Sequence, residues 1–126
     1  MNELAVYRLQ SANERLMAAK DNIENGHYKD AINRSYYAIF TAIRALLAER
    51  SVDFSRHSAV ISYFQREFIK TGVFDKKFSK YLQASFEIRN DCDYADFFVA
   101  AKADAEEQYD HAEELTEAIR RYLEKM

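Results

Sequence analysis

Hydrophobic positions recur at spacings of three and four along almost the whole chain, which is the period of an amphipathic α-helix. The chain contains no proline and only two glycines, so few positions interrupt this pattern. We therefore predict helix throughout, divided into five segments by polar or glycine-containing breaks.

The first two predicted helices are separated by Asn25-Gly26, where a glycine can adopt the left-handed conformation of a helix C-cap. The second helix is predicted over about residues 28 to 49. The hydrophobic stripes of these two segments consist of Leu9, Ala12, Leu16, Ala19 and Ile23, and of Ile32, Tyr36, Ile39, Ile43 and Leu47.

The third predicted helix begins near Ser55, a suitable N-cap residue, and ends at Gly72. The fourth begins near Asp75, and the fifth covers about residues 99 to 124. The stripes consist of Val60, Phe64 and Phe68, of Phe78, Leu82 and Phe86, and of Ala101, Ala105, Ala112, Leu115, Ile119 and Tyr122.

Each stripe must be buried against another, and short connections make successive helices antiparallel neighbours. The expected fold is therefore all-α, an up-and-down bundle of four to five antiparallel helices. With 126 residues, the chain has the length of one ordinary domain, so we expect a single domain over residues 1-126. A domain of this size can bury a core without a metal ion or a disulfide bond.

Composition narrows the class of protein. Hydrophobic residues make up 48% and charged residues 31%, which is typical of a globular chain. No hydrophobic run approaches the roughly 18 residues of a membrane span, so we expect no membrane association. The single cysteine, Cys92, favours a reducing, cytoplasmic location. His27 and His111 lack metal-ligand spacing, and there is no phosphate-cradling glycine loop, so we expect neither a metal nor a cofactor.

The formal net charge is −3, and like charges do not form blocks. Proteins that grip long nucleic acids usually carry a basic stripe, so this distribution argues against binding to long duplex DNA. A local cationic site for a single phosphate remains compatible with it.

The stretch "EIRNDCDYADFF", residues 87 to 98, places polar residues where a hydrophobic stripe should end. Arg89 follows Phe86 by three residues and Leu82 by seven, so it should project from the same helix face. Asp93 lies one turn further along and can reach it. Arg89 and Asp93 could form a structural ion pair; alternatively, the guanidinium could be held beside a cavity to bind phosphate through two hydrogen bonds.

Three runs of sequence together resemble the HEPN domain family (higher eukaryote and prokaryote nucleotide-binding). They are "AINRSYYAIFTAIRALL", "RHSAVISYF" and "IRNDCDY", and the resemblance extends over roughly residues 5 to 123. It implies a helical bundle that is commonly a homodimer, with the two motif regions facing one another. As the resemblance implies, many members are metal-independent endoribonucleases or toxins paired with a small nucleotidyltransferase that is encoded nearby; others are non-catalytic nucleotide- or RNA-binding modules.

The ribonuclease motif of that family is an arginine, four to six residues, and then a histidine. Arg89 matches its first position, and Asn90 matches a polar residue often found next. Tyr94, Ala95 and Asp96 occupy the positions allowed for the histidine, which is therefore missing. A tyrosine with an ordinary pKa of about 10 is a poor base at neutral pH.

Two other residues could replace that base. His57 matches a histidine that recurs in this branch of the family, and it lies in the first turn of the third predicted helix, where the helix dipole would favour a neutral imidazole. Asp93 could also accept a proton, although the carboxylates of Asp91, Asp93 and Asp96 would repel a phosphate. Alternatively, His57 merely packs at the start of its helix.

Aromatic residues are unusually numerous, with nine phenylalanines and nine tyrosines. Tyr37 could stack on a base or fill a dimer seam. Tyr63, Phe74, Phe97 and Phe98 lie near helix ends or outside the main stripes, which indicates an interface. Together with the family resemblance, this predicts a homodimer.

The leading hypothesis is a module that binds a nucleotide or an RNA phosphate through Arg89 and Asn90, with Tyr94 and Tyr37 nearby. Such a module would be non-catalytic or weakly catalytic, and it would act with a small nucleotidyltransferase partner in a toxin-antitoxin-like pair. One alternative is a metal-independent endoribonuclease with Arg89 and a substitute base, His57 or Asp93. The other is a non-catalytic protein-interaction module.

Overall fold

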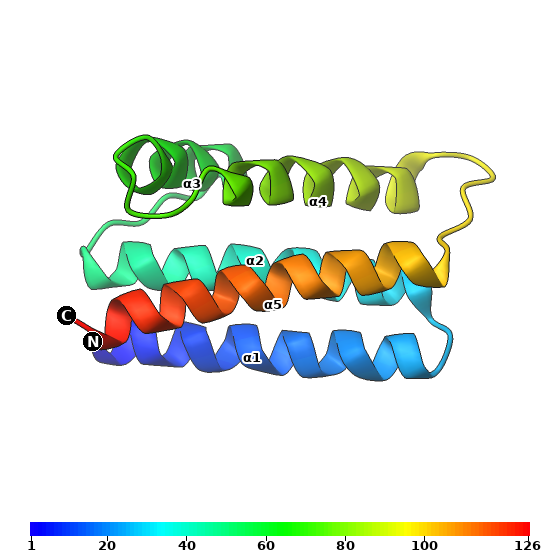
Figure 1. Cartoon of the computed structure of the whole chain (residues 1–126), viewed down its shortest axis with the longest axis horizontal. Helices are drawn as coiled ribbons and strands as arrows, with labels where there is room; N and C mark the ends of the chain where they lie inside the picture. Colours follow the sequence, from blue (N-terminus) through cyan, green and yellow to red (C-terminus); the bar gives the residue numbers. More distant parts are fainter.

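The computed structural model describes all 126 residues and contains five α-helices, one π-helical turn and no β-strand. In chain order the elements are α1 (Glu3–Glu24), α2 (Tyr28–Glu49), α3 (His57–Phe64), the π-helical turn η1 (Gln65–Ile69), α4 (Lys77–Tyr94) and α5 (Lys102–Glu124). The predicted all-α bundle is confirmed. Four helices run along the long axis of the molecule, whereas α3 crosses them and is seen nearly end-on (Figure 1).

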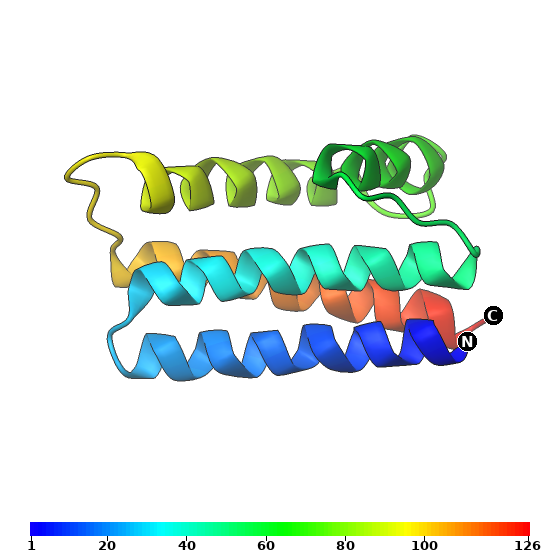
Figure 2. The same ribbon diagram turned by 180° about the vertical axis from the view of Figure 1, so that it is seen from behind.

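Helix α2 lies at the centre of the bundle. It packs against α1 on one side and against α5, α3 and α4 on the others. Figure 2 shows from behind that α4 and α3 form a layer above α2, with α1 below it. The alanines of α2 allow this close approach, because Ala38, Ala42 and Ala45 have no exposed surface.

The break between α1 and α2 is the one that the sequence predicts. Gly26 has a φ of +77°, the left-handed conformation that glycine adopts without strain. Upstream, Asn2 caps α1 by accepting a hydrogen bond from the backbone N–H of Ala5 at 2.8 Å. Local signals therefore account for both ends of this helix.

The start of the third helix differs from the prediction. Helix α3 begins at His57 rather than near Ser55, and no side chain caps it. The reason lies outside the local sequence: the carboxylate of Asp53 accepts hydrogen bonds from Arg44 at 2.9 and 3.0 Å and from Arg8 at 3.2 Å. These contacts with α1 and α2 hold the connection in place and delay the start of the helix.

The predicted interface aromatics divide into two groups. Phe74 is buried, and its ring packs against Phe64, Phe68 and Tyr122, so assigning it to an interface was wrong. The chain turns back after η1, which brings Phe74 over the core. Phe97 has a fully exposed side chain, in agreement with its position off the stripes.

Helix α4 turns a different face to the core than its stripe predicts. Phe78, Leu82 and Ser85 are buried, whereas Phe86 is 51% exposed. Steps of four and three keep Ser85 on the inward face, and one further residue rotates Phe86 towards its edge. Helix α5 also begins later than expected, at Lys102, and Ala101 is exposed.

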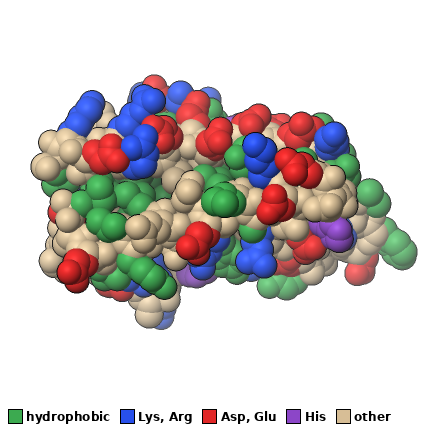
Figure 3. Space-filling model, turned by 90° about the horizontal axis from the view of Figure 1, so that it is seen from below, with side chains coloured by type: hydrophobic (Ala, Val, Ile, Leu, Met, Phe, Trp, Pro, Cys, Tyr) green, Lys and Arg blue, Asp and Glu red, His purple; other side chains and the backbone are tan.

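The face seen from below α1 carries acidic and basic side chains interspersed with hydrophobic ones (Figure 3). No continuous basic stripe crosses that face. None of the helices combines the length and the hydrophobicity that are needed to cross a membrane.

Candidate functional site

Arg89 and Asp93 lie one turn apart near the C-terminal end of α4, and both face α2. The Nε of Arg89 lies 3.1 Å from Oδ2 of Asp93, and the two side chains are 20% and 27% exposed. The Nε–H is poorly aligned with the carboxylate, so the contact is an ion pair rather than a well-formed hydrogen bond. The predicted ion pair is therefore present, but it leaves the rest of the guanidinium free for other contacts.

Helix α2 supplies the partners on the other side of the guanidinium. Nη2 of Arg89 donates a hydrogen bond to the hydroxyl of Tyr37 at 3.1 Å. The guanidinium carbon lies 5.1 Å from the centre of the Tyr36 ring and 5.6 Å from that of Tyr37, which are favourable cation–π distances. Nη1 makes no hydrogen bond with the chain and is not buried, so it is available to an external acceptor.

A polar hollow of about 460 Å³ opens beside this guanidinium. Its lining comes from α1, α2 and α4 and consists of Asn22, Asp30, Asn33, Arg34, Tyr37, Arg89 and Asp93. The amide nitrogen of Asn33 donates to Oδ1 of Asp93 at 3.3 Å and so ties α2 to the end of α4. Arg89 is thus turned towards a sheltered polar space.

The charges around the hollow nearly cancel, since two arginines face two aspartates. Asp93 offsets much of the field of Arg89 because it touches the same guanidinium. Arg34 is exposed, and no carboxylate lies within ion-pair distance of it. An anion entering the hollow would therefore meet one paired and one unpaired arginine.

Tyr36 forms the layer beneath Arg89. Burial raises the pKa of its phenol, although the positive charge of Arg89 acts in the opposite direction. Tyr36 therefore stays protonated at neutral pH and can act only as a neutral hydrogen-bonding group.

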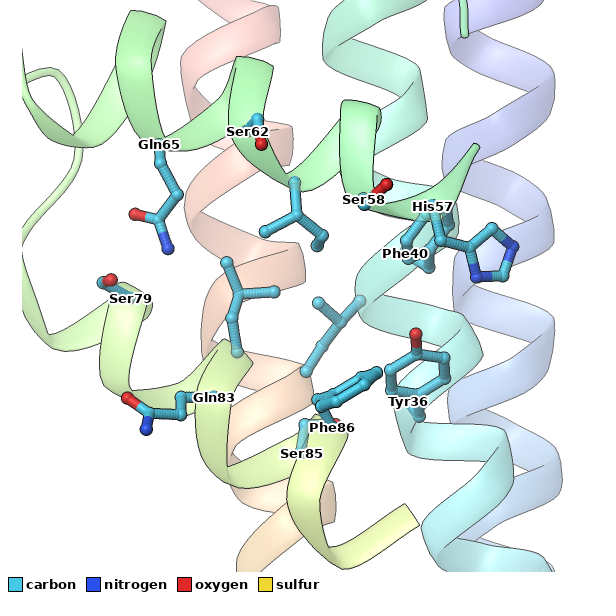
Figure 4. Close-up of a pocket in the computed structure, with 13 residues that line it drawn as sticks. Tyr36, Phe40, His57, Ser58, Ser62, Gln65, Ser79, Gln83, Ser85 and Phe86 are labelled. Carbon is cyan, nitrogen blue, oxygen red and sulfur yellow. The ribbon is translucent and has the colours of Figure 1, made fainter. Parts of the chain in front are cut away.

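His57 lies on the other side of this aromatic layer. Its ring centre is 4.0 Å from that of Phe40 and 6.5 Å from that of Tyr37. The structure shows no contact between His57 and Arg89, and His57 lines a separate pocket between α2, α3 and α4 (Figure 4). The fold thus brings Arg89, Asp93 and Tyr37 together. His57 is near the ring of Tyr37 but does not contact Arg89.

Two other predicted residues lie outside the hollow. Asn90 is half-buried and makes no side-chain hydrogen bond, and Tyr94 is 75% exposed at the end of α4. The thiol of Cys92 has a raised pKa, chiefly because of burial, with Asp93 and Asp91 adding to the effect. A thiol with a raised pKa is a weak nucleophile at neutral pH.

Four residues of the hollow were not predicted as site residues: Asn22, Asp30, Asn33 and Arg34. Asn33 precedes Tyr37 by one helical turn, so a polar stripe on α2 was the available signal. Asn22 belongs to α1, and its approach depends on the tertiary packing. No group of three or more histidine, cysteine, aspartate or glutamate side chains in the structure could hold a metal ion.

Arg89 thus lies near the C-terminal end of α4 and faces α2. A family model described as HEPN domain matches residues 5–122. The chain belongs to the HEPN domain family. Within it, this member has Tyr94, Ala95 and Asp96 where the histidine of the ribonuclease motif would stand, all on the exposed end of α4 and the following turn.

Curated relatives support this HEPN assignment. A Thermotoga maritima protein named "UPF0332 protein" is 34% identical over all of this chain and 98% of its own length. Two Methanocaldococcus jannaschii proteins whose names begin "Putative toxin" are 32% and 35% identical. These matches cover 74% and 68% of this chain, and 64% of each relative.

Proposed function

We propose that this HEPN domain binds a phosphate of RNA or of a nucleotide at the hollow beside Arg89, with little or no catalysis. It would act with a small nucleotidyltransferase partner in a toxin-antitoxin-like pair. The observation that carries the proposal is the guanidinium of Arg89, which is 20% exposed, is fixed by Asp93 and Tyr37, lines the hollow, and has an Nη1 without a hydrogen-bond partner in the chain.

A fixed guanidinium suits this task because less rotational freedom is lost when it binds an anion. Arg34 adds a second positive charge at the same hollow. Weak catalysis is expected because the motif histidine is absent and Asp93 is already paired with Arg89. Cleavage of RNA without a metal ion needs a positioned base as well as a cation.

The decisive test compares Arg89→Ala, Arg89→Lys and wild-type protein by fluorescence anisotropy with a short fluorescein-labelled single-stranded RNA. Losing hydrogen bonds to a charged group costs roughly 1.5 to 3 kcal/mol, so Arg89→Ala should weaken binding by about tenfold to 100-fold. Arg89→Lys keeps the charge but not the planar geometry, and it should recover only part of the affinity.

The matched control is Arg121→Ala, which removes the same charge from an exposed position on α5. It should change the affinity less than about threefold, because exposed charges are screened. If Arg89→Ala is folded and binds RNA as wild type does, the proposed site is wrong. Absence of RNA and nucleotide binding in the wild type would instead favour a protein-interaction module.

The partner and the assembly are part of the same proposal. Two relatives are named as toxins, which supports a paired role for this chain. Phe97, Val99 and Tyr94 are strongly exposed near the end of α4, and we propose that they contribute to a homodimer interface. Light scattering should then give twice the chain mass of 14.8 kDa. Any small nucleotidyltransferase encoded beside this chain should form a complex with it on gel filtration after co-expression. A mass of one chain at micromolar concentration would contradict the homodimer.

A metal-independent endoribonuclease is the second candidate function. It is favoured by the position of His57, whose ring lies near the same Tyr37 that binds Arg89. Total RNA incubated in EDTA should then be cleaved by the wild type, but not by Arg89→Ala or His57→Ala. Intact RNA with wild-type protein would eliminate this activity.

A further inference from the structure

A second pocket, of about 400 Å³, lies between α2, α3, η1 and α4 (Figure 4). Its inner wall is hydrophobic and includes Ile39, Phe40, Ile61 and Leu82. Its volume falls within the range of small-molecule sites, which combine a hydrophobic lining with a few polar groups. The proposed phosphate site does not use this pocket.

Polar groups without partners line the same pocket. Ser85 is 1% exposed, yet its hydroxyl makes no hydrogen bond within the chain. The amide of Gln65 hangs from η1 towards α4 and is likewise unpaired (Figure 4). The Ser85 hydroxyl is not one of the fully enclosed polar groups that lack a partner, so it opens onto the pocket and can pair with a ligand that has a polar edge.

An aromatic ring stands at one side of the opening. Phe86 is 51% exposed, and no other aromatic ring in the chain packs against it. Phe86 and Tyr36 both line the pocket (Figure 4). A flat ligand could therefore stack on Phe86 while its edge reaches the polar groups.

We infer that this pocket binds a nucleobase whose phosphate is held by Arg89; the inference rests on the proposed function. Tyr36 connects the two sites, because its ring lines the pocket while the guanidinium of Arg89 lies 5.1 Å from the ring centre. A nucleotide places one ribose between its base and its phosphate, and the buried ring of Tyr36 is what separates the pocket from the guanidinium. The hydroxyl of Ser85 and the amide of Gln65 offer donors and acceptors to the base edge.

The test compares adenosine 5′-monophosphate with ribose 5-phosphate in NMR chemical-shift titrations of the whole protein. Base stacking on an aromatic ring should make the nucleotide bind roughly 5- to 100-fold more tightly than the sugar phosphate. Phe86→Ala should remove most of this difference and leave the affinity for ribose 5-phosphate unchanged. Tyr7→Ala is the matched control, because it removes an exposed aromatic ring of α1 that is not part of the pocket.

Ser85→Val provides a second variant, since it fills the inner wall and removes the hydroxyl. Its control is Ser35→Val, at a serine that is fully buried and lacks a partner but does not line the pocket. Ser85→Val should lose the preference for the nucleotide, and Ser35→Val should keep it.

The outcomes separate this inference from the proposed function. Equal affinity for the two ligands, lost in Arg89→Ala, would overturn the base pocket but support the phosphate site. A preference for the nucleotide that survives in Phe86→Ala and Ser85→Val would also overturn it. Failure of both ligands to bind would refute the phosphate site and the base pocket together.

Discussion

Asp93 should inhibit phosphate binding, because its carboxylate lies 3.1 Å from the guanidinium that the phosphate would use. Replacing Asp93 with asparagine removes one negative charge from the hollow and keeps a side chain of the same shape. We predict that Asp93→Asn binds RNA more tightly than wild type. This is the opposite of what is expected if Asp93 is a catalytic or ligand-orienting base.

The magnitude follows from the geometry. A phosphate on Nη1 would lie ~6 Å from the Asp93 carboxylate, and two unit charges at that separation repel by ~0.7 kcal/mol in water and by ~3 kcal/mol at an effective dielectric constant of ~20. Since the Asp93 side chain is 27% exposed, a value near the lower end applies, about 1 kcal/mol. Losing the contact that orients Arg89 offsets part of this gain. The net expectation is binding about twofold to fivefold tighter, since 1 kcal/mol corresponds to a factor of about five.

The assay is fluorescence anisotropy with a labelled single-stranded RNA, at low salt and at physiological salt. Asp96→Asn is the control, because it changes the net charge equally at an exposed position outside the hollow. Salt should reduce the effect of Asp96→Asn more than that of Asp93→Asn, since partly buried charges are screened less.

Two results would refute this reasoning. If Asp93→Asn binds as weakly as Arg89→Ala, the ion pair assists binding, and Asp93 must hold Arg89 in its active position. If Asp93→Asn and Asp96→Asn tighten binding equally, the change reflects net charge alone, and the hollow gives no local advantage.

Two further predictions concern stability. Phe64→Ala removes a fully buried ring and should lower the free energy of unfolding by about 3 to 5 kcal/mol. Phe86→Ala removes a half-exposed ring and should lower it by less than about 1 kcal/mol. Urea denaturation measures both values, and equal losses would contradict the burial pattern. Burial alone would raise the pKa of Asp53, but hydrogen bonds from Arg44, the backbone and Arg8 outweigh it and lower the pKa. Because the folded pKa is depressed, this stabilisation is complete above the unfolded value of about 4 and is lost as the pH falls through the folded value. Because half of its side chain is exposed, Asp53 should contribute less than about 1 kcal/mol to stability. Asp53→Asn should therefore be slightly less stable than wild type at pH 7 and equally stable near pH 2. A difference in stability that persists at low pH would contradict the lowered pKa of Asp53.

Local sequence signals account for most of the fold. The spacing of hydrophobic residues and the pair Asn25-Gly26 identify α1 and α2 closely, because helical period and a left-handed glycine act over a few residues. The start of α3 could not be found in this way. It depends on Asp53, whose partner Arg8 lies 45 residues away in sequence.

In the candidate site, too, the sequence predicts contacts within one helix but not contacts between helices. The pairing of Arg89 with Asp93 follows from their separation of one helical turn, and the structure contains it. The bond from Arg89 to Tyr37 joins residues 52 positions apart, so only the packing of α4 on α2 reveals it. Phe86 was assigned to the core because its spacing fits a stripe, yet the small side chain of Ser85 occupies the inward position and leaves room for the pocket.

The ring of Tyr36 lines the pocket and also contacts the guanidinium of Arg89, which lines the hollow, and this has a thermodynamic consequence. An occupant on one side that shifts the ring changes the shape offered on the other side. By linkage, the factor by which a base analogue alters the affinity for phosphate must equal the factor by which phosphate alters the affinity for the analogue. Four dissociation constants, for each ligand alone and with the other ligand at saturation, would show whether binding at one site changes the affinity of the other.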